Sequence, residues 1–188
     1  MKNFKILAIA LTATLFLSSC DKDDNNPAVN EEELITTVEL RLGNVDGSVT
    51  LISKDLDGDG PNAPVVTVSG PLRANTTYIG FVRFLDETKT PAENRTEEIA
   101  AEAKDHQVFY RTSPTTIGTF TYSDLDNDAD GKPRGLAFTL ETRAAGTGNI
   151  TVTLRHKLNK SASGVANGDI TNAGGSTDAE VTYPVTIN

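Results

Sequence analysis

The stretch TTYIGFVRFLDE, residues 76–87, indicates the class of fold. Side chains alternate between the two faces of a β-strand, so one face would carry Tyr78, Gly80, Val82 and Phe84. Aromatic and β-branched residues also favour strands over helices. The stretch therefore predicts a long strand with one buried face.

The same alternation continues through most of the chain. LITTVELRL, residues 34–42, would place five side chains on one face, namely Leu34, Thr36, Val38, Leu40 and Leu42. Shorter stretches of this kind lie at residues 47–53, 65–69, 107–112, 118–124, 135–143, 148–158 and 179–187. Strands with one polar face are typical of antiparallel sheets. The sequence thus predicts an all-β, antiparallel β-sandwich of about eight to nine strands, Ig-like or Greek-key-like.

Proline and glycine positions refine this prediction. Pro64 and Pro71 bracket one short strand, and Pro184 interrupts the last strand. Proline cannot donate to a sheet ladder, so the short strand is predicted as an edge or strand-end element and the last strand to lie at a sheet edge near Pro184. Residues 144–148 are small and contain two glycines, which favours a hairpin loop between the strands on either side.

One segment has helical character. PAENRTEEIAAEAKDH, residues 91–106, predicts a short crossover helix near residues 95–105. Asn94 and Glu97 have the spacing of a capping box. The apolar face is thin, with Ile99 and Ala103, so we expect the helix to lie across a sheet rather than to form a core.

Residues 159–177 are small and polar over an unusual length. Loops longer than about 12–15 residues are uncommon in compact domains and are often mobile or functional. We expect a flexible surface loop, with a lid or recognition loop as the alternative.

The N-terminus has the features of an export signal. Lys2 and Lys5 precede an uncharged, mainly apolar segment, residues 6–17. This segment falls in the range of about 7–15 residues of a secretory signal and is too short to span a bilayer. Residues 17–20, LSSC, resemble a bacterial lipobox. The resemblance implies a signal peptide at residues 1–19 and a mature chain that begins at an acylated Cys20, with palmitate as a typical acyl group. The alternative is an ordinary signal peptide with an incidental cysteine.

The residues after Cys20 carry a second candidate targeting signal. Lys22, Asp23 and Asp24 resemble the export signal of Bacteroidota-type surface lipoproteins, whereas Asp21 can mean inner-membrane retention in other Gram-negative lipoproteins. We expect a lipid anchor in the outer membrane with the protein exposed at the cell surface, and a periplasm-facing protein is the alternative. Residues 20–33 would be the lipidated Cys and a flexible acidic tether, and residues 34–188 the sandwich domain.

Charge and composition limit the classes of partner that this chain is expected to bind. The net charge is −9, and without residues 1–19, which hold two lysines and no acid, it becomes −11. Such a surface repels nucleic acid, so we expect no nucleic-acid partner and membrane contact through the lipid anchor alone. Trp is absent and aromatics make up 6% of residues, which weighs against a carbohydrate-stacking platform. Cys20 is the only cysteine, so the domain has no internal disulfide.

Two loops carry aspartates at alternate positions, DLDGDG at residues 55–60 and DNDADG at residues 126–131. Such carboxylates can converge on one centre, and hard oxygen ligands suit Ca²⁺. Position twelve, a Glu in an EF-hand, is Val66 or Ala137 here, so neither loop is an EF-hand. We predict a structural Ca²⁺ at one or both loops, and the alternative is a solvated acidic turn. The candidate ligands are Asp55, Asp57, Asp59, Asp124, Asp126, Asp128 and Asp130.

Catalytic motifs are missing from the sequence. There is no GxSxG, P-loop or GxGxxG pattern, and the single Cys would be lipidated. His106 and His156 lack the spacing of a zinc motif. We expect both to be structural, and axial ligation of haem is the alternative. The sequence therefore predicts a protein that is not an enzyme.

Several stretches together resemble a family of small Bacteroidota-type lipoproteins: EEELITTVEL, DLDGDGPNAP, LRANTTYIGFV, EEIAAEAKDHQVFY and VTLRHKLNKSASGVANGDITNAGGSTD. Such proteins are sometimes labelled a type 1 periplasmic-binding fold. That label implies an α/β domain with parallel strands, which the alternating strands and the single helix oppose. The resemblance implies no activity.

The functional expectation combines these features. We expect a non-catalytic, lipid-anchored envelope lipoprotein with a binding or adhesion-type β-domain that calcium stabilises. The alternative is a periplasmic or surface solute-binding lipoprotein of an uptake system, for sugar or haem. An enzyme ranks third.

Overall fold

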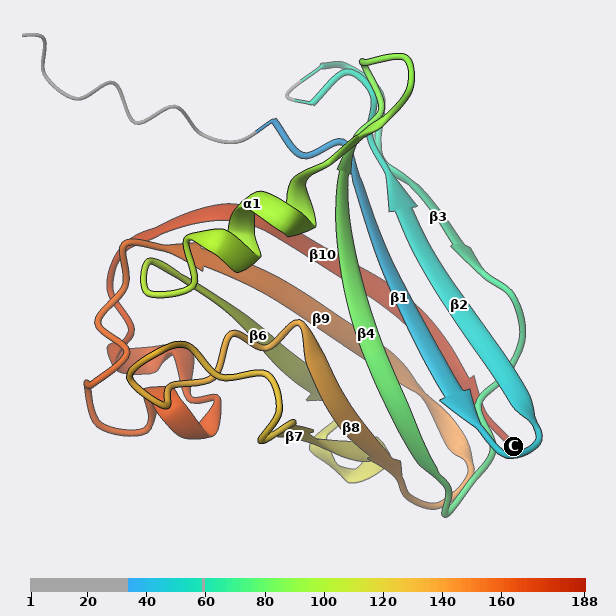
Figure 1. Cartoon of the computed structure of the whole chain (residues 1–188). Coiled ribbons are helices and arrows are strands. Elements are labelled where there is room, and N and C mark those ends of the chain that lie inside the picture. Colours follow the sequence, from blue (N-terminus) through green and yellow to red (C-terminus); the bar gives the residue numbers. More distant parts are fainter. Residues whose placement is uncertain (1–33, 59) are drawn as a thin grey trace, which may run out of the picture. The chain divides into compact units, whose positions relative to one another are not determined.

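The computed structural model describes residues 34–58 and 60–188, which form two antiparallel β-sheets (Figure 1). The predictions on the signal peptide at residues 1–19, on Cys20 and on the tether at residues 20–33 lie outside the described residues. Strands occupy about half of the described residues and helices far fewer, so the all-β prediction is confirmed.

The larger sheet has the strand order β3-β2-β1-β4-β8-β7, and the short β5 pairs with β4. Its members are β1 (Thr37–Asn44), β2 (Gly47–Lys54), β3 (Val65–Val68), β4 (Thr77–Asp86), β5 (Glu93–Asn94), β7 (Gly118–Tyr122) and β8 (Ala137–Thr142). The smaller sheet has the order β10-β9-β6. Its members are β6 (His106–Ser113), β9 (Gly146–His156) and β10 (Ser176–Ile187).

The alternation in residues 76–87 is confirmed in β4, where one face is buried throughout the strand. Tyr78, Val82 and Phe84 join the core between the sheets. Gly80 lies opposite Phe138 of β8, and its missing side chain makes room for that ring. The core receives side chains from both sheets, including Leu40 of β1 and Tyr183 of β10. The antiparallel sandwich is therefore confirmed, with ten strands among the described residues instead of about eight to nine.

The two predicted edge strands are confirmed, because β3 and β10 end their sheets. The predicted hairpin at residues 144–148 is wrong. β8 pairs with β4 and β7, whereas β9 pairs with β6 and β10, so this turn carries the chain from one sheet to the other. A turn signal cannot distinguish the two cases, since both need the same local backbone.

The helix α1 (Arg95–Ala101) connects the larger sheet to β6 of the smaller one, as a crossover helix. It lies over one end of the sheets and buries Ile99 (Figure 1). The helix ends before the predicted limit of 105. The capping box is wrong in its bonding: Asn94 is the N-cap, but its Nδ2 donates to Glu97 Oε1 at 2.9 Å and caps no backbone amide.

Residues 159–177 form a packed segment with two short 3₁₀ helices, η2 (Val165–Asn167) and η3 (Ile170–Asn172). Val165 and Ala173 are buried against Phe109 and Leu158 in a second small core. The expectation of a flexible loop rested on the length and polar composition of the segment and missed these two apolar anchors. A third 3₁₀ turn, η1 (Thr115–Ile117), joins β6 to β7.

Candidate functional sites

The second acidic loop pairs each of three carboxylates with a cation of the same chain. Asp126 Oδ1 lies 2.8 Å from Arg134 Nε. Asp128 Oδ2 lies 3.0 Å from Lys160 Nζ, and Asp130 Oδ2 lies 2.9 Å from Lys104 Nζ. The fourth candidate ligand, Asp124, is exposed.

The Asp128–Lys160 pair is the most buried of these contacts, with side-chain exposures of 2% and 5%. Burial disfavours the charged carboxylate, but amide hydrogen bonds from Lys132 and Asp130 and the Lys160 ammonium outweigh it and lower the pKa of Asp128. Burial lowers the pKa of Lys160, against the opposing effect of Asp128. A calcium ion in this loop would compete with three cations already in contact.

The first acidic loop is differently arranged. Asp57 Oδ2 accepts a hydrogen bond of 2.7 Å from Asn62 Nδ2, and this bond is the main cause of a lowered pKa of Asp57. Asp55 Oδ1 is buried and has no hydrogen-bond partner among the described residues. Asp59, the third candidate ligand, lies outside the described residues. Among the described residues, neither Asp55 nor Asp57 has a basic partner, whereas in the second loop three of the four candidate ligands have one.

The two histidines, which the sequence separates by fifty positions, lie in contact. His106 opens β6 and His156 closes β9, and the ladder places them directly opposite each other. Their rings stack with centroids 4.5 Å apart and planes 9° from parallel. Each histidine lies at or next to the end of a predicted strand, and this was the only sequence feature that pointed to the contact. The contact depends on the register between β6 and β9, which neither strand sequence determines alone.

Two carboxylates flank the histidine stack. Asp178 Oδ2 lies 3.5 Å from His106 Nε2, and Asp178 Oδ1 lies 3.8 Å from His156 Nδ1. A β-bulge between Thr177 and Ala179 sets the position of Asp178. On the other side, Glu102 Oε2 lies 3.8 Å from His106 Nδ1.

This arrangement does not fit axial ligation of haem by both histidines. In that ligation the iron lies between two imidazole nitrogens on opposite faces of the porphyrin. Here the two rings stack face to face at 4.5 Å, so their nitrogens lie at the edges of the stack.

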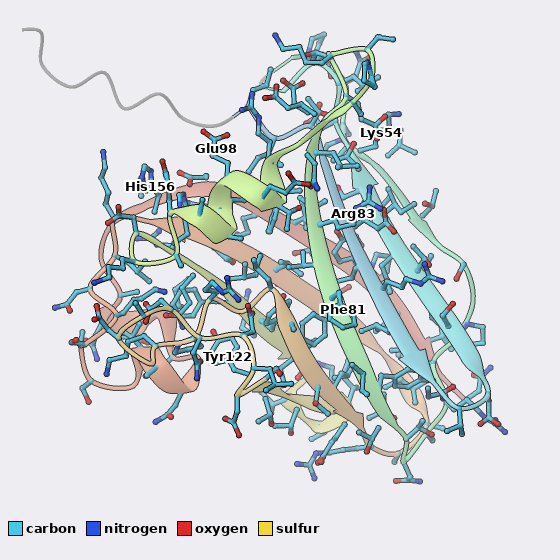
Figure 2. All side chains as sticks on the ribbon, in the orientation of Figure 1. Lys54, Phe81, Arg83, Glu98, Tyr122 and His156 are labelled. Atoms are coloured by element: carbon cyan, nitrogen blue, oxygen red, sulfur yellow. The ribbon has the colours of Figure 1, made fainter. Side chains whose placement is uncertain are left out.

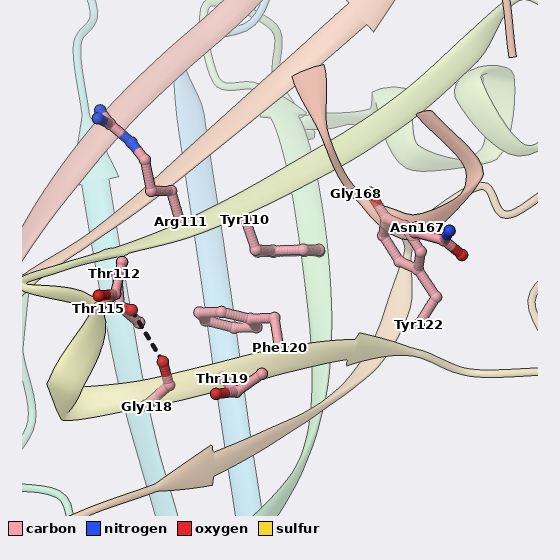
Figure 3. A pocket seen from close by; sticks show the side chains of 10 residues that line it. All are labelled: Tyr110, Arg111, Thr112, Thr115, Gly118, Thr119, Phe120, Tyr122, Asn167 and Gly168. Carbon is pink, nitrogen blue, oxygen red and sulfur yellow. Dashed lines mark hydrogen bonds between the residues drawn. The ribbon is translucent and has the colours of Figure 1, made fainter. Parts of the chain in front are cut away.

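A cavity of about 270 Å³ opens between the two sheets where β6 and β7 form their edges (Figure 3). Tyr110 and Phe120 stack there with centroids 4.9 Å apart, and Arg111 turns away from them. The Tyr122 hydroxyl donates to Val108 O and the Tyr110 hydroxyl to Gly135 O. Burial raises the pKa of both phenols, so both stay neutral.

A second hollow, of about 710 Å³, lies on the outer face of the larger sheet. Ile79 and Phe81 of β4 are exposed there by 62% and 55%, and Arg83 follows on the same face (Figure 2). The face is open to solvent along β4 and β1.

No family model, curated protein or solved structure matches this chain. Within residues 34–58 and 60–188, no helix is long and apolar enough to cross a membrane. The fold and these sites are therefore interpreted from their own chemistry.

Proposed function

We propose that the chain is a lipid-anchored outer-membrane lipoprotein, exposed at the cell surface, whose β-sandwich binds a ligand without catalysing a reaction. The proposed lipid anchor and surface location rest on the sequence of residues 1–24, where a lipobox-like segment ends at Cys20 and Lys22-Asp23-Asp24 follow. Two or more acyl chains on one cysteine would hold the protein stably at a membrane.

The observation that carries the binding role is the cavity between β6 and β7. It combines aromatic rings with hydroxyl and amide groups, contributed by Tyr110, Phe120, Thr112, Thr115, Thr119 and Asn167. Its volume of about 270 Å³ is close to the lower end of ligand pockets, which begin at about 300 Å³. No His, Cys, Asp or Glu is among its described lining residues, and the one charged residue of the lining, Arg111, turns away from the aromatic pair (Figure 3). This favours a neutral ligand and a non-catalytic site.

A single sugar ring is the ligand class that this lining fits best. Apolar ring faces pack on aromatic side chains, while sugar hydroxyls pair with threonine and asparagine groups. This supports the sugar version of an uptake or capture role over the haem version, because the histidine stack does not fit haem.

Tyrosine fluorescence provides a direct test of binding. Trp is absent, and two of the four tyrosines line the cavity. We expect common monosaccharides at millimolar concentration to change the emission, and haemin to bind no more strongly to this chain than to an unrelated acidic protein.

Matched variants identify the site. Asn167→Ala should weaken sugar binding about fivefold, because one hydrogen bond contributes about 1 kcal/mol. Asn149→Ala, an exposed asparagine of β9 outside the cavity, should leave it unchanged. A complete absence of response to sugars, or equal effects of both variants, would reject the cavity as a sugar site.

Calcium support is proposed for the first acidic loop, where Asp55 and Asp57 lack basic partners. With a dissociation constant of about 10⁻⁴–10⁻³ M, 10 mM Ca²⁺ would stabilise the fold by about 1.4–2.7 kcal/mol. A thermal melt with calcium and then with a chelator measures this. Asp55→Asn should abolish the shift and Asp124→Asn should keep it, whereas no shift in the parent chain would make both loops ordinary acidic turns.

The anchor has its own test. In a Bacteroidota host, an alkyne-tagged fatty acid should label the full chain and fail to label Cys20→Ser. Protease added to intact cells should degrade the parent chain, and alanines at Lys22, Asp23 and Asp24 should protect it. Labelling of the Cys20→Ser variant would disprove acylation at this cysteine.

A further inference from the structure

Asp178 is a buried acid in an unusual environment. Its side chain is 1% exposed, and neither carboxylate oxygen has a hydrogen-bond partner among the described residues. Among the described residues, the basic side chains within 4 Å of it are His106, with Nε2 at 3.5 Å, and His156, with Nδ1 at 3.8 Å. A buried carboxylate is costly unless positive charge or donors compensate for the lost water. The compensation here must come through the two imidazoles.

A metal ion on the far side of the imidazoles would supply that charge. When the nitrogens next to Asp178 carry the protons, His106 Nδ1 and His156 Nε2 present their lone pairs away from Asp178. In the structure His106 Nδ1 lies 3.3 Å from the backbone oxygen of Glu102, which can only accept a hydrogen bond, and 3.8 Å from carboxylate Oε2. Metal binding at His106 Nδ1 therefore replaces the hydrogen bond that the protonated ring nitrogen donates to Glu102 in the metal-free chain.

Three residues supply a compact donor set. Glu102, His106 and His156 each offer a ligand atom, and these atoms lie within 4.8 Å of one another. Two imidazoles and one carboxylate are the ligands of many zinc sites and of other divalent transition-metal sites. Hard cations such as Ca²⁺ prefer oxygen atoms throughout, which separates this cluster from the aspartate loops.

We propose that Glu102, His106 and His156 bind a divalent transition metal such as Zn²⁺, with Asp178 as the outer carboxylate that orients both imidazoles. Metal-bound histidines commonly donate their second nitrogen to a carboxylate, which fixes the ring orientation and raises the basicity of the ligand. The bulge at Asp178 and the register of β6 and β9 build this arrangement.

Loading requires a small local closure. Ligand atoms around a tetrahedral zinc lie about 3.3 Å apart, given metal–ligand distances of about 2.0–2.1 Å. Glu102 follows the last turn of α1, and its side chain is half exposed, while His156 lies at the end of β9 (Figure 2). Both can therefore approach the fixed ring of His106, and the solvent-facing side keeps one coordination position open for water or a partner's ligand.

The test is metal titration of the full chain in mild detergent, carrying Cys20→Ser to remove the only thiol and lacking any affinity tag. Calorimetry with Zn²⁺ should give one equivalent, and Co²⁺ should develop the visible absorption of nitrogen–oxygen ligation. An excess of Ca²⁺ should not displace either ion.

Single substitutions assign the bound ion to these residues. His156→Ala and Glu102→Gln should each weaken zinc binding at least tenfold, while Glu97→Gln, an exposed acid of the same helix, should leave it unchanged. Asp178→Asn should weaken binding about 10–100-fold while the three ligands remain. Thermal melts without metal confirm that each variant is folded.

Three results would overturn the proposal. The first is the absence of zinc binding by the parent chain. The second is zinc binding that survives His156→Ala, which would assign the ion to the aspartate loops. The third is zinc affinity that is unchanged by both Glu102→Gln and Asp178→Asn, because neither carboxylate would then act at the site.

Discussion

Lys160 and Asp128 form an ion pair with almost no access to solvent. Lys160 Nζ also donates to Ala103 O, so this one ammonium connects the segment after α1 to the second acidic loop. Replacing Lys160 by Ala would leave Asp128 buried without its cation. Removing one partner of a buried pair costs about 3–5 kcal/mol, and we expect a loss of this size in urea denaturation.

Lys104 and Asp130 provide the matched control. Their side chains are 63% and 62% exposed at a comparable distance of 2.9 Å. Exposed pairs contribute about 0–1 kcal/mol, so Lys104→Ala should change the free energy of unfolding by less than about 1 kcal/mol. Equal losses in the two variants would show that burial does not decide the strength of these pairs.

Glu87 links three strands at one end of the larger sheet. Its carboxylate accepts hydrogen bonds from Thr37 of β1 and Lys54 of β2, and its backbone amide donates to Thr36. The bond from Lys54 is the largest cause of a lowered pKa of Glu87, followed by the bond from Thr37, while burial opposes both.

This lowered pKa has a defined consequence for acid stability. The folded chain holds the Glu87 proton more weakly than the unfolded chain, so the stabilisation is complete above the unfolded pKa of about 4.3 and is lost as the pH falls through the lower, folded pKa. Glu87→Gln should therefore destabilise by about 1–2 kcal/mol at pH 7, and the gap to the parent should close in acid. Urea denaturation from pH 7 to pH 3 measures this gap, and a constant gap would refute the assignment.

At the scale of the element, Gly80 lets two strands pack an aromatic ring between them. A Cβ at Gly80 would lie 2.2 Å from Phe138 Cε2, far closer than van der Waals contact. Gly80→Ala should force the Phe138 ring to move and lower the free energy of unfolding by about 1–3 kcal/mol, because tightly packed cores resist added volume. Thermal melts would show the loss.

Gly43 of β1 is the matched control for Gly80. A Cβ at Gly43 would meet its nearest atom, Ile79 O, at 3.8 Å, an ordinary contact. Gly43→Ala should be neutral or slightly stabilising, since alanine has less conformational freedom to lose. Adding Phe138→Leu to Gly80→Ala replaces the ring by a smaller side chain and should recover part of the lost stability. If stability is not recovered, the strain caused by Gly80→Ala does not come from contact with Phe138.

The elements themselves were predictable because their signals are local. The alternation in residues 76–87 requires only neighbouring positions, and β4 appears with the expected buried face. In residues 34–42 the expected side chains are buried from Thr36 to Leu42, whereas Leu34 lies before β1 and is exposed.

The prediction of a hairpin at residues 144–148 was wrong because the sequence of the turn does not decide whether the two flanking strands pair. Whether they pair with each other or join different sheets depends on distant strands. The prediction of a flexible loop at residues 159–177 missed the packing of this segment. Val165 and Ala173 pack against apolar side chains of β6 and of the segment after β9, which are distant in the sequence.

At the scale of the whole molecule, the candidate metal site depends on two facts that no local pattern contains. One is the register that sets His106 opposite His156, and the other is the bulge that shifts Asp178. The aspartate loops show the converse. Their spacing is conspicuous in the sequence, yet Lys104, Arg134 and Lys160 reach the second loop from other parts of the chain.

The two sheets are joined through their common core and by a hydrogen bond across it. The Tyr183 hydroxyl of β10 donates to Val38 O of β1 at 2.8 Å, over 145 positions of sequence. Both groups are buried, and burial raises the pKa of Tyr183, so the phenol stays protonated and able to donate. Phenylalanine would keep the packing of the ring and leave the Val38 carbonyl without this donor.

Tyr183→Phe therefore tests whether the sandwich unfolds as one unit. The loss of a buried hydrogen bond whose acceptor remains should cost about 1–3 kcal/mol. If the sheets unfold together, the urea midpoint falls while the slope of the transition stays unchanged, since the same surface becomes exposed. Circular dichroism and tyrosine fluorescence should then give coincident transitions in the parent and in the variant. Separate transitions in the variant would mean that each sheet holds its own structure and that the contact between them is weaker than their shared core implies.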